Sequence, residues 1–216
     1  MKKIKKLIEF HIVVVGSYKC GKTQIISRFI DNSFHTYSPA TTWIDSQFKK
    51  VKMEDGIEVK VKIYDTPGRE NYKNIATNYI IKADGIIINY DITDKQSFNE
   101  VEYYWINEIK ERYLLKEKIV FIVGNKTDLE DNRVISKEEG EKLAEKYEVM
   151  FYECSAKTGE NVDFIFNELI KICYSSTEKR KEEKKGREEK EEKRRREIEE
   201  EKLKKNLKIL NKYLSF

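Results

Sequence analysis

Eight residues near the start of the chain constrain its fold more than any other stretch. They lie between the apolar run IEFHIVVV at 8–15 and an amphipathic stretch at 22–31, and they are Gly16, Ser17, Tyr18, Lys19, Cys20, Gly21, Lys22 and Thr23. The spacing matches GxxxxGK[ST], a loop between a strand and a helix whose backbone N–H groups converge on phosphate oxygens. We expect Lys22 to reach the β- and γ-phosphates of a nucleotide and the Thr23 hydroxyl to ligate Mg²⁺.

Short apolar runs alternate with longer amphipathic stretches, which is the pattern of a sheet covered by helices. The sequence predicts strands at 8–15, 46–53, 57–64, 86–91, 119–124 and 149–154, and helices at 22–31, 70–82, 96–114, 136–147 and 160–175. Glu54-Asp55-Gly56 is a hairpin signal, so one strand should be antiparallel in an otherwise parallel sheet. Ser136 and Glu139 fit a capping box at a helix start.

The charge distribution divides the chain near residue 176. Residues 177–216 carry 16 basic and 11 acidic side chains, whereas the whole chain carries 43 and 39, so the net charge of +4 comes from this tail. The nearly neutral remainder gives no indication of a nucleic-acid surface, so no nucleic-acid partner is expected. We predict a globular domain at 1–176 and a charged tail at 177–216. A solvated helix with i, i+4 ion pairs and a disordered segment are both open for the tail.

Cysteine usage and hydropathy indicate the compartment. Cys20, Cys154 and Cys173 are widely spaced, follow no CxxC or zinc pattern, and are expected to be reduced thiols. No apolar run reaches the roughly 18 residues that span a bilayer. Glu9 and His11 interrupt the apolar stretch near the N-terminus, which argues against a signal peptide. A soluble, cytoplasmic protein is therefore predicted.

Two later motifs indicate which base is bound. Asn125-Lys126-Thr127-Asp128 follows an apolar strand, at the end of the sheet where open α/β folds bind ligands. The Asp128 carboxylate can accept hydrogen bonds from the N1–H and the 2-amino group of guanine, a pair of donors that adenine lacks. Ser155-Ala156-Lys157 follows the last strand and would offer a backbone N–H to guanine O6. An ATP-using protein is the weaker alternative.

Taken together, GSYKCGKT, DTPGREN, NKTD and CSAK occur in the order and at the spacings of Ras-superfamily small GTPases. YDITDKQSF and YKNIATNY make the chain most similar to the Rab family. The resemblance covers residues 8–175 and no part of the tail. It implies the α/β fold of a P-loop NTPase small G domain, with a six-stranded, mostly parallel sheet flanked by five helices.

The resemblance also implies function and further site residues. It implies a Mg²⁺-dependent switch that binds GTP and GDP, acts in membrane trafficking or signalling, and meets effectors, exchange factors and GTPase-activating proteins. Thr41 in the first switch would ligate Mg²⁺ and touch the γ-phosphate, and Phe34 would stack on the guanine. Asp65 would hold Mg²⁺ through water, and the Gly68 N–H would contact the γ-phosphate. The expected metal set is Thr23, Thr41 and Asp65, and the expected catalytic set is Lys22, Thr41, Gly68 and the degenerate position Arg69. The expected nucleotide-binding set is Gly16, Ser17, Tyr18, Lys19, Cys20, Gly21, Lys22, Thr23, Phe34, Thr41, Asp65, Gly68, Asn125, Lys126, Asp128, Ser155, Ala156 and Lys157.

Four side chains depart from the family pattern. Arg69 stands where most relatives have the Gln that orients the attacking water, and a guanidinium has donors but no acceptor, so slow hydrolysis is expected. Tyr18 is bulky at a position that is small in most relatives, and Pro67 removes a backbone donor. Trp43 is suited to anchoring a partner, with packing against a neighbouring helix as the alternative. A GTP-bound scaffold without turnover is the alternative function.

The C-terminal end also departs from the family. The sequence ends KYLSF with no cysteine after Cys173, so no prenyl anchor is expected. Leu203, Leu207, Leu210 and Leu214 would share one helical face, with lysines on the other side. Three uses of residues 198–216 are open: an anionic membrane surface, a coiled-coil or other partner contact, and docking on the chain's own domain. The first would place the protein peripherally on endomembranes without a lipid anchor.

Overall fold

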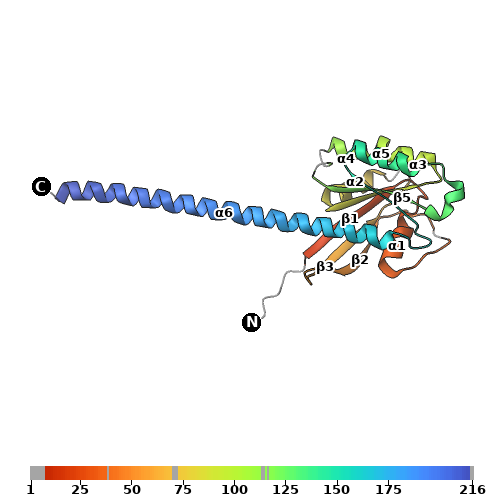
Figure 1. Cartoon of the computed structure of the whole chain (residues 1–216), viewed down its shortest axis with the longest axis horizontal. Helices are drawn as coiled ribbons and strands as arrows, with labels where there is room; N and C mark the ends of the chain where they lie inside the picture. Colours follow the sequence, from red (N-terminus) through yellow and green to blue (C-terminus); the bar gives the residue numbers. More distant parts are fainter. Residues whose placement is uncertain (1–7, 38, 70–72, 113–114, 116, 215–216) are drawn as a thin grey trace. The chain divides into compact units, whose positions relative to one another are not determined.

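A six-stranded sheet forms the centre of the domain in the computed structural model (Figure 1). The structure describes residues 8–37, 39–69, 73–112, 115 and 117–214, without the side chains of 73, 74, 181, 183, 200, 201 and 203–214. The strands are β1 (Ile8–Gly16), β2 (Asp45–Lys52), β3 (Glu58–Asp65), β4 (Gly85–Asp91), β5 (Ile119–Asn125) and β6 (Met150–Cys154). Their order in the sheet is β2-β3-β1-β4-β5-β6. The predicted fold class is confirmed.

The predicted antiparallel strand is β2, which pairs with β3 so that Phe48 lies opposite Lys62. The other four pairings are parallel. At the hairpin, the Met53 N–H donates to the carbonyl of Ile57 at 2.8 Å, and the Gly56 N–H donates back to the Met53 carbonyl at 2.9 Å. The parallel strands β1, β3, β4, β5 and β6 all end at one edge of the sheet, which is where the sequence motifs follow them.

Helices cover both faces of the sheet, with α3, α4 and α5 on one side and α1 on the other (Figure 1). The helical elements are α1 (Lys22–Asp31), α2 (Lys73–Lys82), α3 (Lys95–Glu100), the π-helix η2 (Val101–Ile106), α4 (Asn107–Glu111), the 3₁₀ helix η3 (Thr127–Asn132), α5 (Lys137–Lys146) and α6 (Val162–Leu214). On the first side, Val13, Ile88 and Ile122 of the strands pack in one buried cluster with Ile80 of α2 and Trp105 of η2. Burial of these side chains supplies most of the driving force for forming the layers.

The opposite face has its own apolar contacts. Phe29 of α1 stacks on Phe166 of α6 with ring centroids 4.4 Å apart, and offset aromatic stacking of this kind adds about 0.5–1.5 kcal/mol beyond the buried area. A Cβ on Gly85 would come within 3.0 Å of the Leu169 side chain, so α6 packs directly on the start of β4. These contacts fix where β1 and α1 meet, and therefore where the loop between them lies.

Two helical predictions need correction. The stretch 96–114 is not one regular α-helix, because α3 gives way to the π-helix η2 before α4. The wider turn brings the consecutive residues Trp105 and Ile106 into the core while Tyr103 stays 77% exposed. The helix expected over 136–147 is α5, and its capping box is confirmed, with the Glu139 N–H 3.2 Å from the Ser136 hydroxyl oxygen.

The second correction concerns the last helix, which does not end near 175 but runs from Val162 to Leu214. Of the two states left open for the tail, the structure describes the helix, and its i, i+4 contacts include Arg196 to Glu192 at 2.6 Å. The chain divides into two units, 1–173 and 174–216. The four leucine side chains of the amphipathic end lie outside the described residues. Within the described part of the chain, none of the helices combines the length and apolar character needed to cross a bilayer.

Candidate functional site

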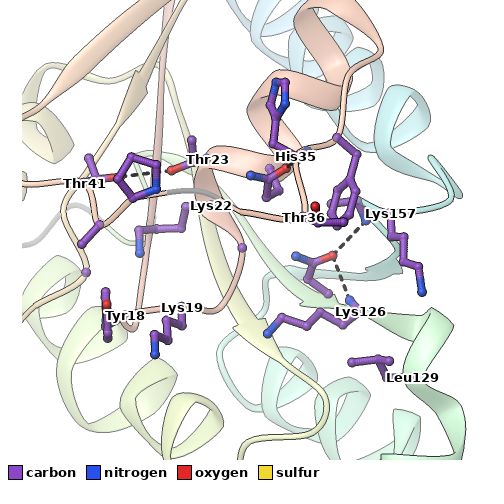
Figure 2. Close-up of a pocket in the computed structure, with 18 of the residues that line it drawn as sticks. Tyr18, Lys19, Lys22, Thr23, His35, Thr36, Thr41, Lys126, Leu129 and Lys157 are labelled. Atoms are coloured by element: carbon purple, nitrogen blue, oxygen red, sulfur yellow. Dashed lines mark hydrogen bonds between the residues drawn. The ribbon is translucent and has the colours of Figure 1, made fainter.

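A pocket of about 380 Å³ opens at the edge of the sheet where the parallel strands end. This volume lies within the range of about 300–1,000 Å³ that is usual for small-molecule sites. Tyr18, Lys19 and Lys22 lie towards one end, and Lys126, Leu129 and Lys157 lie towards the other (Figure 2). We call these the Tyr18 end and the Asp128 end. The candidate residues that line the pocket are Tyr18, Lys19, Gly21, Lys22, Thr23, Phe34, Thr41, Gly68, Asn125, Lys126, Asp128, Ala156 and Lys157.

The remaining candidate residues are not among those that line the pocket. They are Gly16, Ser17, Cys20, Asp65, Arg69 and Ser155. Lys22 is 6% exposed, and its ammonium donates to the carbonyls of Gly16 at 3.0 Å and Ser17 at 2.8 Å. No carboxylate pairs with this ammonium among the described residues, so its charge is available to an anionic ligand.

Asn125 ties together three loops at the Asp128 end. Its side-chain amide donates to the Cys20 carbonyl at 3.0 Å, and its oxygen accepts from the backbone N–H groups of Lys126 at 2.8 Å and Ala156 at 3.1 Å. A Cβ at Gly21, where φ is 98°, would lie only 2.3 Å from the Asn125 nitrogen. A glycine is therefore required for the loop to approach Asn125 this closely.

The Asp128 carboxylate is held in place by two neighbours. The Ser155 hydroxyl donates to one of its oxygens at 2.6 Å, and the Lys157 ammonium lies 3.4 Å from the other. The Asp128 side chain is only 11% exposed. A carboxylate in this position still has free lone pairs, so it can accept two N–H donors from a ligand base in the pocket.

Thr23, Thr41 and Asp65 converge between β1, β3 and the segment before β2. The Thr23 hydroxyl donates to an Asp65 carboxylate oxygen at 2.7 Å and lies 3.1 Å from the Thr41 hydroxyl, which is itself 3.4 Å from the same carboxylate oxygen. The other Asp65 oxygen is buried without a hydrogen-bond partner within the described part of the chain. Burial raises the pKa of Asp65. Two hydroxyls and a carboxylate, one of whose oxygens is buried and unpaired, form the donor set of a hard cation such as Mg²⁺, so these residues fit the predicted metal.

At the Tyr18 end, Gly68 lies directly against the phosphate loop. A Cβ on Gly68 would come within 2.5 Å of the Lys22 ammonium and 2.7 Å of the Ser17 carbonyl oxygen. The next residue, Arg69, has its guanidinium carbon 5.0 Å from the centre of the Tyr18 ring. A hydrogen bond from Arg69 and the positive charges of Lys19 and Arg69 lower the pKa of the exposed Tyr18 phenol. Two of the side chains that depart from the family pattern therefore face each other.

Comparison with known proteins identifies the family. The family model described as the Ras family matches residues 11–175. The chain belongs to the Ras family. The Ras-related protein SEC4 of Candida albicans is 38% identical over 161 residues, which are 74% of this chain and 75% of that protein. The Ras-related protein Rab-10 of Caenorhabditis elegans is 38% identical over 160 residues, 74% of this chain and 78% of that protein. The Ras-related protein Rab-15 of Homo sapiens is 34% identical over 173 residues, 80% of each chain. The predicted recognition of a Rab-like small GTPase is confirmed.

The sequence analysis missed several residues that shape the site of this Ras-family chain. Arg28 of α1 donates to the carbonyls of Ala156 at 2.9 Å and Lys157 at 2.8 Å, and so anchors the loop behind Asp128. Asp91 forms an ion pair with the Lys126 ammonium. Neither residue has a local signal, because each contacts a loop that is distant in sequence.

The phosphate loop is likewise held by residues from other elements. The Ser17 hydroxyl donates to Glu100, the last residue of α3, at 2.7 Å. Asn89 donates to the Cys20 carbonyl at 2.9 Å, and its nitrogen lies 3.3 Å from the thiol sulfur of Cys20, which is 1% exposed. A polar residue inside the buried strand GIIINYD is the one signal by which Asn89 could have been found.

Trp43 and Tyr37 are 80% and 87% exposed in the segment that contains Thr41. The alternative for Trp43, packing against a neighbouring helix, is therefore wrong. Its function as a partner anchor stays a prediction.

Proposed function

We propose that this Ras-family chain is a guanine-nucleotide switch that binds GTP and GDP with Mg²⁺ and hydrolyses GTP slowly. The observation that carries the proposal is one pocket with Asp128 and Asn125 at one end and the hydroxyls of Thr23 and Thr41, next to Asp65, towards the other. A guanine base fits the first set and a Mg²⁺-bound triphosphate fits the second. Phe34 lines the same pocket and would stack on the base.

Each step of hydrolysis would use residues already described. Water would attack the γ-phosphorus in line while the bond to the β–γ bridging oxygen breaks, and the products are GDP and phosphate. Lys22 and the loop N–H groups would stabilise the charge on the phosphate oxygens. Mg²⁺, held by Thr23, Thr41 and, through water, Asp65, would supply Lewis-acid polarisation of these oxygens. The Gly68 N–H would contact the γ-phosphate, so this contact would be lost after hydrolysis.

Slow turnover follows from Arg69. A water-orienting residue must accept a hydrogen bond from water, and the guanidinium has no acceptor. Arg69→Gln should therefore raise the single-turnover rate, measured by phosphate release from preloaded GTP. An unchanged rate would shift the block to Tyr18 or Pro67.

The family relationship supports a cellular role as well. We propose a switch in membrane trafficking that is peripheral on endomembranes and meets effectors, exchange factors and GTPase-activating proteins through the segments around Thr41 and Gly68, with Trp43 as one anchor. The tail end, 198–216, would contact an anionic membrane surface or a coiled-coil partner. Co-sedimentation with liposomes, with and without 198–216, tests the membrane arm, and equal binding of both proteins contradicts it.

The alternative is a GTP-bound scaffold without turnover, which the lack of an acceptor at Arg69 favours. The nucleotide released when freshly purified protein is denatured separates the two. Mostly GDP supports the slow GTPase, mostly GTP supports the scaffold, and an empty site contradicts guanine-nucleotide binding.

A further inference from the structure

Two cations lie close to the ring of Tyr18 at one end of the pocket. The Lys19 ammonium is 5.2 Å from the ring centre, and the Arg69 guanidinium carbon is 5.0 Å from it. Both distances are within the range of cation–π attraction. Tyr18 itself is 38% exposed and lines the pocket. The Tyr18 ring of the phosphate loop therefore lies against Arg69, which comes from the segment after β3.

The backbone next to Arg69 is seated on the same loop. Gly68 approaches the Ser17 carbonyl and the Lys22 ammonium so closely that any side chain at this position would collide with them. This contact brings Arg69 to the loop, and the Tyr18 ring determines where its guanidinium lies. The backbone contact of Gly68 and the ring of Tyr18 thus together determine the position of the Arg69 guanidinium.

The positive charges at the Tyr18 end favour the binding of an anion. Lys19, Lys22 and Arg69 are all positive, and in the described part of the chain none of them is paired with a carboxylate. Like charges gathered in this way repel each other unless a negative ligand lies among them. A guanidinium can stack on a ring with its face while its edge still donates hydrogen bonds to phosphate oxygens. Stacking on Tyr18 is therefore compatible with phosphate binding by Arg69.

We propose that Tyr18 and Arg69 act as one unit, a γ-phosphate clamp, in which the Tyr18 ring positions the Arg69 guanidinium to bind the terminal phosphate of GTP. The inference rests on the proposed function and adds a specificity determinant to it. GDP has no γ-phosphate for Arg69 to bind, so the clamp strengthens binding of GTP and leaves binding of GDP nearly unchanged. The residue that slows hydrolysis is then also the residue that makes the site prefer the triphosphate.

The test compares two nucleotides in the full-length protein. Dissociation constants for GDP and for GppNHp, a non-hydrolysable GTP analogue, are measured with Mg²⁺ by competition against a fluorescent guanine nucleotide. The variants are Tyr18→Ala, Arg69→Ala, the double variant and Tyr18→Phe, which keeps the ring face. Tyr103→Ala is the matched control, because Tyr103 is 77% exposed on η2 and does not line the pocket.

Each alanine variant should weaken GppNHp binding about tenfold, the size of one desolvated cation–π or charged hydrogen-bond contact, and change GDP binding by less than about twofold. The double variant should be no weaker than Arg69→Ala, because the two residues act as a unit. Tyr18→Phe should retain part of the preference for GppNHp, because the ring face stays while the hydrogen bond from Arg69 to the phenol is lost, and Tyr103→Ala should retain all of it.

Three results would overturn the clamp. The first is an equal loss of affinity for GDP and GppNHp in the alanine variants. The second is a loss of GppNHp affinity in the double variant that equals the sum of the two single losses, and the third is a Tyr18→Ala variant that keeps full GppNHp affinity. Circular dichroism establishes that each variant is folded, and Arg69→Ala gives the answer if Tyr18→Ala is not. A wild-type protein that binds neither nucleotide would overturn the proposed function and the clamp together. A wild-type protein that binds both without hydrolysis would contradict only the turnover, because the affinity ratio is measured without it.

Discussion

The two ends of the pocket are built in different ways. At the Asp128 end, the polar groups bind one another: Asn125 bridges two loops, and Asp128 accepts from Ser155 and lies beside Lys157. At the Tyr18 end, Arg69 lies over the Tyr18 ring, Gly68 approaches the phosphate loop closely, and the Lys22 ammonium donates to backbone carbonyls, so the positive charges there have no carboxylate partner among the described residues. One end is organised by hydrogen bonds within the protein, and the other has charges that a ligand would neutralise.

This difference indicates how much each end of the pocket contributes to the free energy of nucleotide binding. A preorganised acceptor loses little entropy when a base enters, so the Asp128 end should contribute to the affinity for GDP and GTP alike. A cluster of like charges gains most when an anion arrives, so the Tyr18 end should respond to the number of phosphates. The four predictions below test this division, from the largest expected effect to the smallest.

Removing Asp128 should have the largest effect. Asp128→Ala deletes the acceptor for two base N–H groups, and hydrogen bonds to a charged group contribute about 1.5–3 kcal/mol each. We expect GDP and GppNHp to bind about a hundredfold more weakly, equivalent to about 2.7 kcal/mol. Titration calorimetry measures both, with Asp131→Ala, an exposed neighbour, as the control. A loss of affinity confined to GppNHp would contradict the expectation that the Asp128 end contributes equally to binding of GDP and GTP.

Removing Asn125 should affect stability next. Asn125→Ala leaves the buried Ala156 N–H without its acceptor and removes one of the two donors to the Cys20 carbonyl, which keeps Asn89. The free energy of unfolding should fall by about 2 kcal/mol, as measured by urea denaturation without nucleotide. Asn132→Ala is the control, since Asn132 is exposed. A stability equal to that of the wild type would mean that the network does not organise the apo site.

The hydrogen bond from Ser17 to Glu100, at the Tyr18 end, should contribute less to the free energy of unfolding. Glu100→Ala removes the carboxylate that accepts from the hydroxyl of the buried Ser17, which is one side-chain contact, whereas Asn125→Ala removes contacts to two loops. The expected loss in the same denaturation experiment is about 1 kcal/mol, with the exposed Glu111→Ala as control. A loss larger than that of Asn125→Ala would reverse the comparison between the ends.

The smallest effect lies outside both ends, at Glu102 of η2. Hydrogen bonds from Lys146 and Tyr147 of the neighbouring α5 segment lower the pKa of this carboxyl. Its contribution to stability is therefore present above the usual Glu pKa of about 4.3 and is lost as pH falls through the lowered value in the folded protein. Because the Lys146 side chain is 59% exposed, the contribution should be only about 0.5 kcal/mol.

Glu102→Gln against wild type, in denaturation experiments at neutral and acidic pH, measures this contribution, and Glu145→Gln serves as the exposed control. The difference in unfolding free energy should shrink on acidification, while the affinities for both nucleotides stay equal to those of the wild type. A difference that grows at acidic pH would contradict the assigned sign.

The same contrast separates what the sequence could predict from what it could not. The phosphate loop, the NKTD and SAK segments, the hairpin and the capping box are each encoded within a few consecutive residues, so local rules found them. The π-helix η2 was missed because it depends on how Trp105 and Ile106 both reach the core. The stacking of Arg69 on Tyr18, the bond from Ser17 to Glu100 and the anchoring of Ala156 by Arg28 join residues distant in sequence. Only the closed fold brings these pairs together, because a single sequence carries no record of which side chains meet.

Because Cys20 is buried, the rate at which its thiol reacts can report how often the phosphate loop opens. All three cysteines are buried, and Cys20, within the loop, is 1% exposed. A thiol reagent can reach this sulfur only when the loop lifts from Asn89 and Asn125, so the labelling half-life reports how often the loop opens. A nucleotide that holds the loop closed should slow the labelling, so that its rate is proportional to the fraction of protein that remains free of nucleotide. Mass spectrometry of the peptide containing Cys20 could then follow loading and release of nucleotide without any attached dye.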